Sequence, residues 1–160
     1  VEGAAEKAAQ FEDEVVFKGF EKAKVEGLLS SVEHKGGSFP SDPEKIVEKV
    51  SAGVSTMVTS GIGGPYALVV TPEIWQQLTG YIKGRPLKSH LEDMLEGKVV
   101  LSSHVDSPIL LSTRGGDFVL TVGQDHSIGY STHETQTVDL YLTESFTFQV
   151  FEPRAAVIFG

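Results

Sequence analysis

Apolar residues near the start of the chain recur at the three- and four-residue steps of an amphipathic helix. The stripe consists of Ala4, Ala8, Phe11 and Val15, widened by Ala5, Ala9, Val16, Phe17 and Phe20. This spacing places the side chains on one helical face. The pattern predicts a helix that ends near Gly19 or Ala23.

A second helix is marked at both ends. Ser41 or Asp42 can cap its start, and Pro43 suits its first turn. Gly61 follows its last apolar position. The expected buried face consists of Ile46, Val47, Val50, Val54, Met57 and Val58. The preceding segment, residues 34–40, is rich in glycine and predicts a loop.

A strand, two helices and another strand are expected next. The continuous apolar run at residues 66–70 is typical of a buried strand. Helices are predicted from Thr71-Pro72 to about Leu78 and from Pro86 to Gly97, and residues 99–101 form the closing strand.

The last third of the chain has β-type composition. Strands are expected at residues 109–113, 118–122, 127–131 and 137–151, with a hairpin turn at Gly115-Gly116 joining the first two. In the last strand six apolar residues fall on one parity, which only Glu144 interrupts: Val138, Leu140, Leu142, Phe146, Phe148 and Val150. At about 3.3 Å per residue, 15 residues reach roughly 50 Å, which exceeds the usual strand length. So long a strand favours an elongated, shell-forming subunit over a compact enzyme.

Composition and charge exclude several classes of protein. The 160 residues contain no cysteine, which excludes a disulfide scaffold, a thiolate zinc site and a cysteine nucleophile. Thirteen basic and 22 acidic residues give a net charge of −9. Because nucleic acids and anionic membranes attract positive surfaces, this balance argues against both as partners. No apolar run approaches the roughly 20 residues of a membrane-spanning helix, so we expect a soluble, cytoplasmic protein.

The histidines and serines match no catalytic pattern. His104 lies two residues before Asp106, and His133 follows His126 by seven, but zinc hydrolases need two ligands on one helical face. Ser60 opens a glycine-rich run that superficially resembles a nucleophile loop, yet a helix precedes it and a strand follows, the reverse of a hydrolase elbow. We expect no catalytic residues, no metal site and no cofactor.

Several short motifs occur in a fixed order along the chain. The first half contains Phe-Glu-Asp-Glu-Val-Val-Phe-Lys-Gly at 11–19, Gly-Leu-Leu-Ser at 27–30 and Gly-Pro-Tyr at 64–66. The second half contains Arg-Gly-Gly-Asp-Phe at 114–118, Gly-Gln-Asp at 123–125, Ser-Ile-Gly-Tyr at 127–130 and Thr-Glu-Ser-Phe-Thr-Phe at 143–148. From about residue 8 to 159, their spacing resembles that of the encapsulin shell proteins, also called the linocin M18 or maritimacin-like family.

The resemblance implies an α+β fold of the HK97 phage-capsid type. Residues 1–26 would be part of the spine helix of the peripheral domain, residues 27–122 mainly the compact axial α/β domain, and residues 123–160 the long strands returning to the peripheral domain. The implied function is a homo-oligomeric, icosahedral nanocompartment that encloses cargo enzymes, ferritin-like proteins or peroxidases, captured by a C-terminal targeting peptide. The alternatives are a phage-type major capsid protein and, less favoured, a protease or bacteriocin-like activity.

Two sites are carried over from the family. A groove for the cargo peptide would use Ile128 and Tyr130 with Leu140 and Leu142 behind them, although simple core packing explains the same residues equally well. A loop lining the five-fold pore would consist of Tyr81, Ile82, Lys83, Gly84 and Arg85. Its two cations would favour anions, although an exposed flexible loop predicts the same composition.

The start of the chain suggests a truncated fragment. The sequence begins at Val1 inside a helical pattern, and the upstream helix and extended E-loop of the family have no counterpart. We therefore expect apolar surface to be exposed on Phe11, Val15, Phe146 and Phe148.

Overall fold

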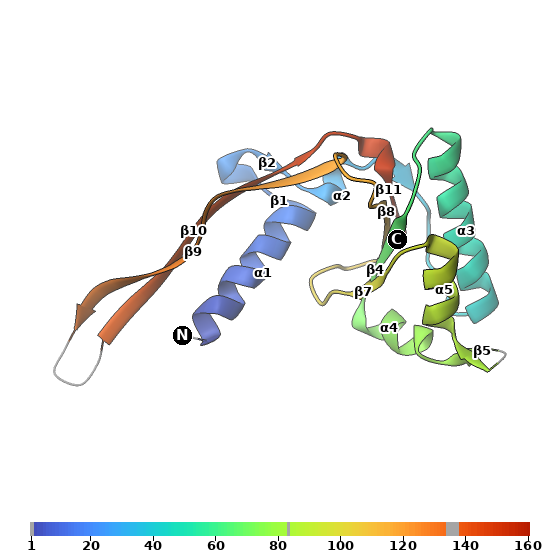
Figure 1. The fold of residues 1–160 in the computed structure, drawn as a ribbon, viewed down its shortest axis with the longest axis horizontal. Helices are drawn as coiled ribbons and strands as arrows, with labels where there is room; N and C mark the ends of the chain where they lie inside the picture. Colours follow the sequence, from blue (N-terminus) through green and yellow to red (C-terminus); the bar gives the residue numbers. More distant parts are fainter. Residues whose placement is uncertain (1, 83, 134–137) are drawn as a thin grey trace. The chain divides into compact units, whose positions relative to one another are not determined.

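The chain is divided between two structural units, each built from separate segments (Figure 1). The structure, a computed structural model, describes residues 2–82, 84–133 and 138–160. The first unit contains Val1–Ser30 and Phe118–Val150, and the second contains Ser31–Asp117 and Phe151–Gly160. Across the described ranges, every helix is too short or too polar to span a lipid bilayer.

The first unit combines one long helix with a two-stranded ribbon. Its elements are α1 (Glu2–Lys18), β1 (Gly19–Phe20), η1 (Glu21–Ala23), β2 (Val25–Glu26), α2 (Leu28–Ser31), β9 (Phe118–His133) and β10 (Val138–Val150). β1 and β2 form a small antiparallel hairpin, and β9 and β10 pair antiparallel along their length. The expected helix and the expected long strand are both present.

The ribbon contains irregularities that place extra residues on β9. β9 has 16 residues and β10 has 13. Leu142 pairs with Ile128 and Phe146 pairs with Val122, so four residue steps on β10 match six on β9. A third extra residue lies where Asp139 pairs with Thr132 and Leu140 pairs with Tyr130. Such extra residues are β-bulges, which bend and twist a strand locally. Figure 1 shows the ribbon, in orange and red-brown, curving along its length.

The second unit is a five-stranded mixed sheet with helices. Its elements are β3 (His34–Lys35), α3 (Pro43–Thr59), β4 (Tyr66–Val70), α4 (Pro72–Leu78), β5 (Tyr81–Ile82), β6 (Arg85–Pro86), α5 (Leu87–Leu95), β7 (Val99–Leu101), β8 (Ile109–Ser112), η2 (Pro153–Ala155) and β11 (Ala156–Ile158). The strand order is β3-β11-β8-β4-β7. β4 and β7 are parallel, so the helices α4 and α5 lie in the crossover between them, as the sequence predicts.

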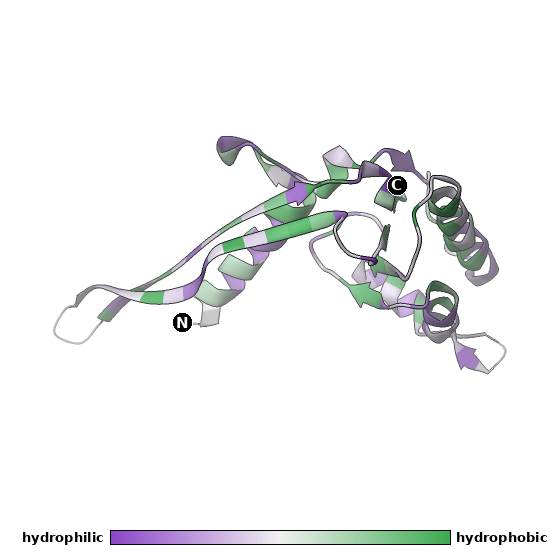
Figure 2. Ribbon diagram, turned by 45° about the horizontal axis from the view of Figure 1, so that its top comes forward, coloured by the Kyte–Doolittle hydropathy of each residue, from purple (hydrophilic) through white to green (hydrophobic). Residues whose placement is uncertain are grey.

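Helices α3 and α5 cover the sheet of the second unit. α3 contacts β8 and β11, α5 contacts β4 and β7, and the two helices contact each other. α3 begins where expected because the Asp42 carboxylate accepts hydrogen bonds from the N–H groups of Glu44 and Lys45, both at 3.1 Å. All five residues of β4 are buried, and Figure 2 shows hydrophobic residues concentrated in the sheet and on α3.

The predicted Gly115-Gly116 hairpin is wrong. β8 pairs with β4 and β11 rather than with β9, whose partner is β10. Both glycines have positive φ, so they do form a turn, but this turn carries the chain out of the second unit. The residues of β8 are buried on both faces of the strand, as is typical of a strand in the middle of a sheet. β9, the expected hairpin partner, is largely exposed and belongs to the other unit. The separate strands expected at 118–122 and 127–131 are one continuous strand.

Other differences are local. Val58 is 57% exposed although it was expected on the buried face of α3, and Gly53 is buried instead because it packs against the ring of Phe159. The segment at residues 34–40 contains the short edge strand β3. Residues 123–160 were expected to return to the domain that contains the first helix. Only the part up to Val150 does so, because Phe151–Gly160 belongs to the second unit, where β11 joins the five-stranded sheet.

Candidate functional site: an apolar groove in the first unit

An apolar groove of about 700 Å³ runs between α1 and β10 within the first unit. The helix contributes Ala4, Ala8, Phe11 and Val15, which follow one another at the helical spacing seen in the sequence. The strand contributes residues 140–146, whose even-numbered members share one face. Small alanines on the helix leave the space open. We call this feature the α1–β10 groove.

Aromatic rings form part of the groove wall. Phe11 meets Phe20 edge to face at 5.3 Å between ring centroids and meets Phe146 at 6.3 Å. Val15 is 3% exposed and Phe148 is 6% exposed, so the expectation that both would be exposed is wrong. They are buried because α1 and β10 pack against each other. Phe11, at 42% exposure, matches the expectation.

A smaller hollow of about 340 Å³ adjoins the groove and shares Ala4, Leu140 and Leu142 with it. Ile128 and Val138 complete its apolar wall. The two hollows together form one concave apolar surface that extends from β10 onto β9.

The structure brings together the four residues proposed from the sequence for peptide binding. Leu140 pairs with Tyr130 and Leu142 pairs with Ile128, so all four lie on one face of the ribbon. Ile128 is 62% exposed, Tyr130 57% and Leu140 50%. Side chains so exposed are not core residues, so simple core packing does not explain them. Tyr130 lines neither hollow and stands beside them.

A polar cluster sits at the bulges of the ribbon. Gln124 donates to Ser127 at 2.7 Å, and the hydroxyl groups of Ser127 and Thr143 are 2.9 Å apart. Next to this cluster, His126 Nε2 lies 2.9 Å from Glu144 Oε2. Sequence reasoning missed this pair. Its one visible sign was Glu144, the residue that interrupts the apolar parity of the strand.

The residues expected to line a pore lie in the second unit. β5 and β6 form a small hairpin in which Tyr81 pairs with Pro86 and Ile82 pairs with Arg85. Lys83 and the side chains of Tyr81 and Ile82 lie outside what the structure describes. Gly84 has a φ of +81°. The exposed Arg85 guanidinium forms an ion pair with Asp93 at 2.9 Å, which offsets part of its positive charge.

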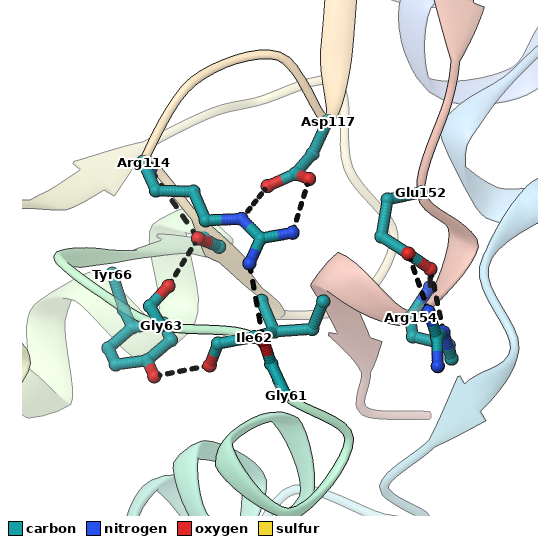
Figure 3. A network of polar contacts seen from close by, with 9 residues as sticks. Gly61, Ile62, Gly63, Tyr66, Arg114, Asp117, Glu152 and Arg154 are labelled. Atoms are coloured by element: carbon teal, nitrogen blue, oxygen red, sulfur yellow. Dashed lines mark hydrogen bonds and ion pairs between the residues drawn. The ribbon is translucent and has the colours of Figure 1, made fainter.

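A network of charged and polar groups surrounds the points where the chain leaves and re-enters the second unit (Figure 3). Arg114 Nε and Nη2 donate to the buried Asp117 carboxylate, both at 2.8 Å, and Nη1 donates to the Gly61 carbonyl. The Asp117 carbonyl accepts from the N–H groups of Phe151 at 2.8 Å and Glu152 at 3.3 Å. We call this arrangement the Arg114–Asp117 clasp. It gives a structural reason for the Arg-Gly-Gly-Asp motif.

Both arginines in Figure 3 are held in their charged form. The hydrogen bonds with Asp117 raise the pKa of Arg114. Hydrogen bonds from the side chain and backbone of Arg154 lower the pKa of Glu152 from 4.5 to about 2. These shifts follow from the pairing of charged groups within a structural network.

The other catalytic candidates from the sequence lack the necessary geometry. Ser60 Oγ lies 3.2 Å from His34 Nε2 but donates its proton to the Thr56 carbonyl at 3.0 Å. This bond to the helix backbone competes with donation of the Ser60 proton to His34, which a general base would have to accept. Among residues 2–82, 84–133 and 138–160, no three His, Asp or Glu side chains form a group able to hold a metal ion. His133 and Glu134 lie outside the described side chains.

The fold is that of viral and virus-like capsid shells. It superposes on a virus-like particle from Pyrococcus furiosus with a TM-score of 0.76 and 19% identity, over 95% of this chain and 63% of that one. It also matches a chain described as the capsid of an empty GTA particle, with a TM-score of 0.65 and 14% identity, over 97% of this chain and 61% of that one. At these identities the likeness establishes the α+β, HK97-type fold expected from the sequence.

Sequence comparison then places the chain within one family of such shells. The Linocin_M18 family model, described as "Encapsulating protein for peroxidase", matches residues 1–147, and the chain belongs to this family. It is 34% identical to the type 1 encapsulin shell protein of Mycobacterium tuberculosis over 98% of this chain and 60% of that protein. It is 38% identical to the type 1 encapsulin shell protein of Rhodospirillum rubrum over 96% of this chain and 56% of that protein. The chain therefore spans about 60% of the length of the curated relatives it matches.

Proposed function

We propose that the protein is a structural subunit that assembles with copies of itself into a closed, icosahedral nanocompartment. The observation that carries this proposal is the pairing of a capsid-type fold with membership of the encapsulin family. The ribbon is consistent with a lateral contact, because β9 and β10 form a two-stranded sheet that carries exposed apolar side chains. Unpaired sheet edges and apolar patches favour association with another chain.

We propose that the compartment encloses an enzyme and has no catalytic role of its own. The family description names a peroxidase as the enclosed protein, and a ferritin-like protein is the other candidate from the resemblance. The proposed compartment is cytoplasmic. The catalytic candidates in the sequence are not arranged for catalysis among the described residues, which argues against a protease or bacteriocin-like activity.

Cargo capture is assigned to the α1–β10 groove. Leu140 and Leu142 line this groove, Ile128 lines the adjoining smaller hollow, and Tyr130 lies outside both. The four side chains share one face of the ribbon, with Ile128, Tyr130 and Leu140 exposed and Leu142 half-buried, as a C-terminal targeting peptide would need. Light scattering coupled to size exclusion tests assembly and capture together. We expect particles in the megadalton range that retain a cargo protein, and elution as single chains or small oligomers would refute the proposal.

A phage-type capsid is the second candidate, because the fold also matches a phage chain, from Mycobacterium phage Che8, with a TM-score of 0.63. The net charge of −9 argues against direct binding of DNA by this chain, because proteins that bind DNA neutralise its phosphates with positive side chains. Nuclease-protected DNA in purified particles would favour the capsid, and its absence together with bound protein cargo favours the compartment.

We propose that the loop from Tyr81 to Arg85 lines a five-fold pore and favours the passage of anions. The sequence places two cations in each copy, so a ring of five copies would concentrate positive charge at one opening. In assembled particles, replacing Lys83 and Arg85 together by glutamate should reverse the preference in an ion-flux measurement. An unchanged preference would show that this loop is simply exposed.

A further inference from the structure

A separate pocket of about 330 Å³ lies in the second unit, between the edge strand β3 and the helix α3. α3 contributes Ala52 and Gly53, whose small size leaves the space open. The apolar part of the wall also includes Val157 and Phe159, which are 2% and 1% exposed and therefore fixed in the core. A cavity of this volume suits a small ligand. We call it the β3–α3 pocket.

Three basic side chains line the β3–α3 pocket: His34 and Lys35 from β3, and Lys49 from α3. They gather at one place in a chain whose net charge is −9. Lys35 has a further interaction with the described part of the chain, so it adds positive charge here without being assigned as a ligand contact. The other two are the candidates for direct contact.

One acidic side chain, Glu33, also lines the pocket. Its charge acts on Arg154 as well, because hydrogen bonds with Glu152 raise the pKa of Arg154 and the negative charges of Glu152 and Glu33 raise it further. Glu33 therefore offsets only part of the positive charge, and the pocket favours an anion.

Lys49 is the cation best placed for a ligand. Its side chain is half-buried, and its ammonium forms no ion pair and no hydrogen bond within residues 2–82, 84–133 and 138–160. Nζ lies 3.8 Å from the point that a side-chain carbon on Gly37 would occupy, so the ammonium is held beside the Gly36-Gly37 turn. An anion in the pocket would supply the partner that the protein does not.

His34 provides a second polar contact. Its Nε2 lies 3.2 Å from Ser60 Oγ at the end of α3, and this contact fixes the imidazole at the pocket wall. The other ring nitrogen of a protonated imidazole donates hydrogen bonds, as an oxyanion requires.

We propose that the β3–α3 pocket binds a small phosphate monoester, whose dianion contacts Lys49 and His34 and whose apolar body contacts Val157 and Phe159. A phosphate monoester carries a charge of about −1.5 to −2 at pH 7 and three acceptor oxygens, which matches several cations better than a single carboxylate does. The inference is independent of shell assembly and of cargo capture.

Saturation-transfer difference NMR of small ligands with the intact protein provides the test, because it detects the ligand whatever the size of the particle. The probe is phenyl phosphate, and its twins are benzoate, with one negative charge, and neutral benzyl alcohol. At pH 7.5 and low ionic strength, we expect phenyl phosphate to bind at least about tenfold more tightly than benzyl alcohol and at least about threefold more tightly than benzoate.

A pair of variants on α3 locates the binding. Lys49→Gln keeps most of the side-chain stem and removes the charge, so it should weaken the binding of phenyl phosphate at least about tenfold. Lys45 lies one turn earlier, is exposed and is outside the pocket lining, so Lys45→Gln should retain the affinity. An equal loss in both variants would show a general attraction to positive charge and would overturn the site.

The ligand comparisons decide the proposal on the unchanged protein, so it does not depend on the folding of a variant. Equal binding of phenyl phosphate and benzyl alcohol, or binding of neither, overturns it. Inorganic phosphate that binds as tightly as phenyl phosphate overturns the assigned contact between the apolar body and Phe159.

Discussion

Replacing Asp117 by alanine removes the buried half of the Arg114–Asp117 clasp. The Asp117 side chain is 8% exposed and accepts two hydrogen bonds from Arg114, both at 2.8 Å. A hydrogen bond to a charged group contributes roughly 1.5–3 kcal/mol to stability. The Arg114 side chain is 34% exposed, so water recovers part of this loss, and we expect a destabilisation of about 2 kcal/mol.

The single tryptophan provides the assay. Trp75 lies in α4, in the same unit as the clasp, so its fluorescence during urea unfolding reports that unit. With a urea dependence of roughly 2 kcal/mol per molar, a loss of about 2 kcal/mol lowers the midpoint by about 1 M. Replacing Arg114 instead should be more damaging, because it leaves a buried carboxylate unpaired rather than an arginine within reach of water.

A matched control exists on α5. Asp93 also pairs with an arginine at 2.9 Å, but the two side chains are 66% and 59% exposed. Asp93→Ala should change stability by less than about 0.5 kcal/mol. If Asp117→Ala were as mild as Asp93→Ala, burial would not be what makes the clasp important, and the reasoning would be refuted.

Two further changes have defined outcomes. A side-chain carbon added at Gly129 would overlap the far end of the Tyr141 ring, which is 50% exposed and must turn aside. Gly129→Ala should therefore destabilise the ribbon by no more than about 1 kcal/mol, and a second change, Tyr141→Ser, should remove this loss in hydrogen exchange. Because Arg154 lowers the pKa of Glu152 to about 2, this carboxylate contributes stability that is complete above its ordinary pKa of 4.5 and is lost as pH falls towards 2. The stability gap between the wild type and Glu152→Gln should therefore be constant from pH 7 to 5.5 and should shrink by pH 3; a gap that widens on acidification would contradict this assignment.

Much of the fold follows from local sequence signals. α3 is predictable because Asp42 and Pro43 mark its start and a 3.6-residue period continues to its end. β4 is predictable from five consecutive apolar residues, and β10 from its two-residue period. In each case the signal lies within the element itself.

The failures involve partners that are distant in the sequence. Nothing local shows that β8 lies between β4 and β11, because these contacts join residues 40 or more positions apart. The bulges of β9 interrupt the two-residue period, so the strand reads as two.

The same contrast between local and distant signals explains why only part of the candidate site was predictable from the sequence. The apolar residues of the groove are visible in the periods of α1 and β10, and Glu144 is visible as an irregularity. Its partner His126 belongs to another strand, and the register that joins them depends on two bulges.

Electron microscopy of the protein purified from the cells that make it tests the central claim most directly. The account predicts closed particles of uniform size with icosahedral symmetry, in which the ribbon of β9 and β10 contacts neighbouring copies and the α1–β10 groove faces an interior that contains protein. Particles that never form, in a preparation where the protein is folded and dispersed as single chains, would contradict it.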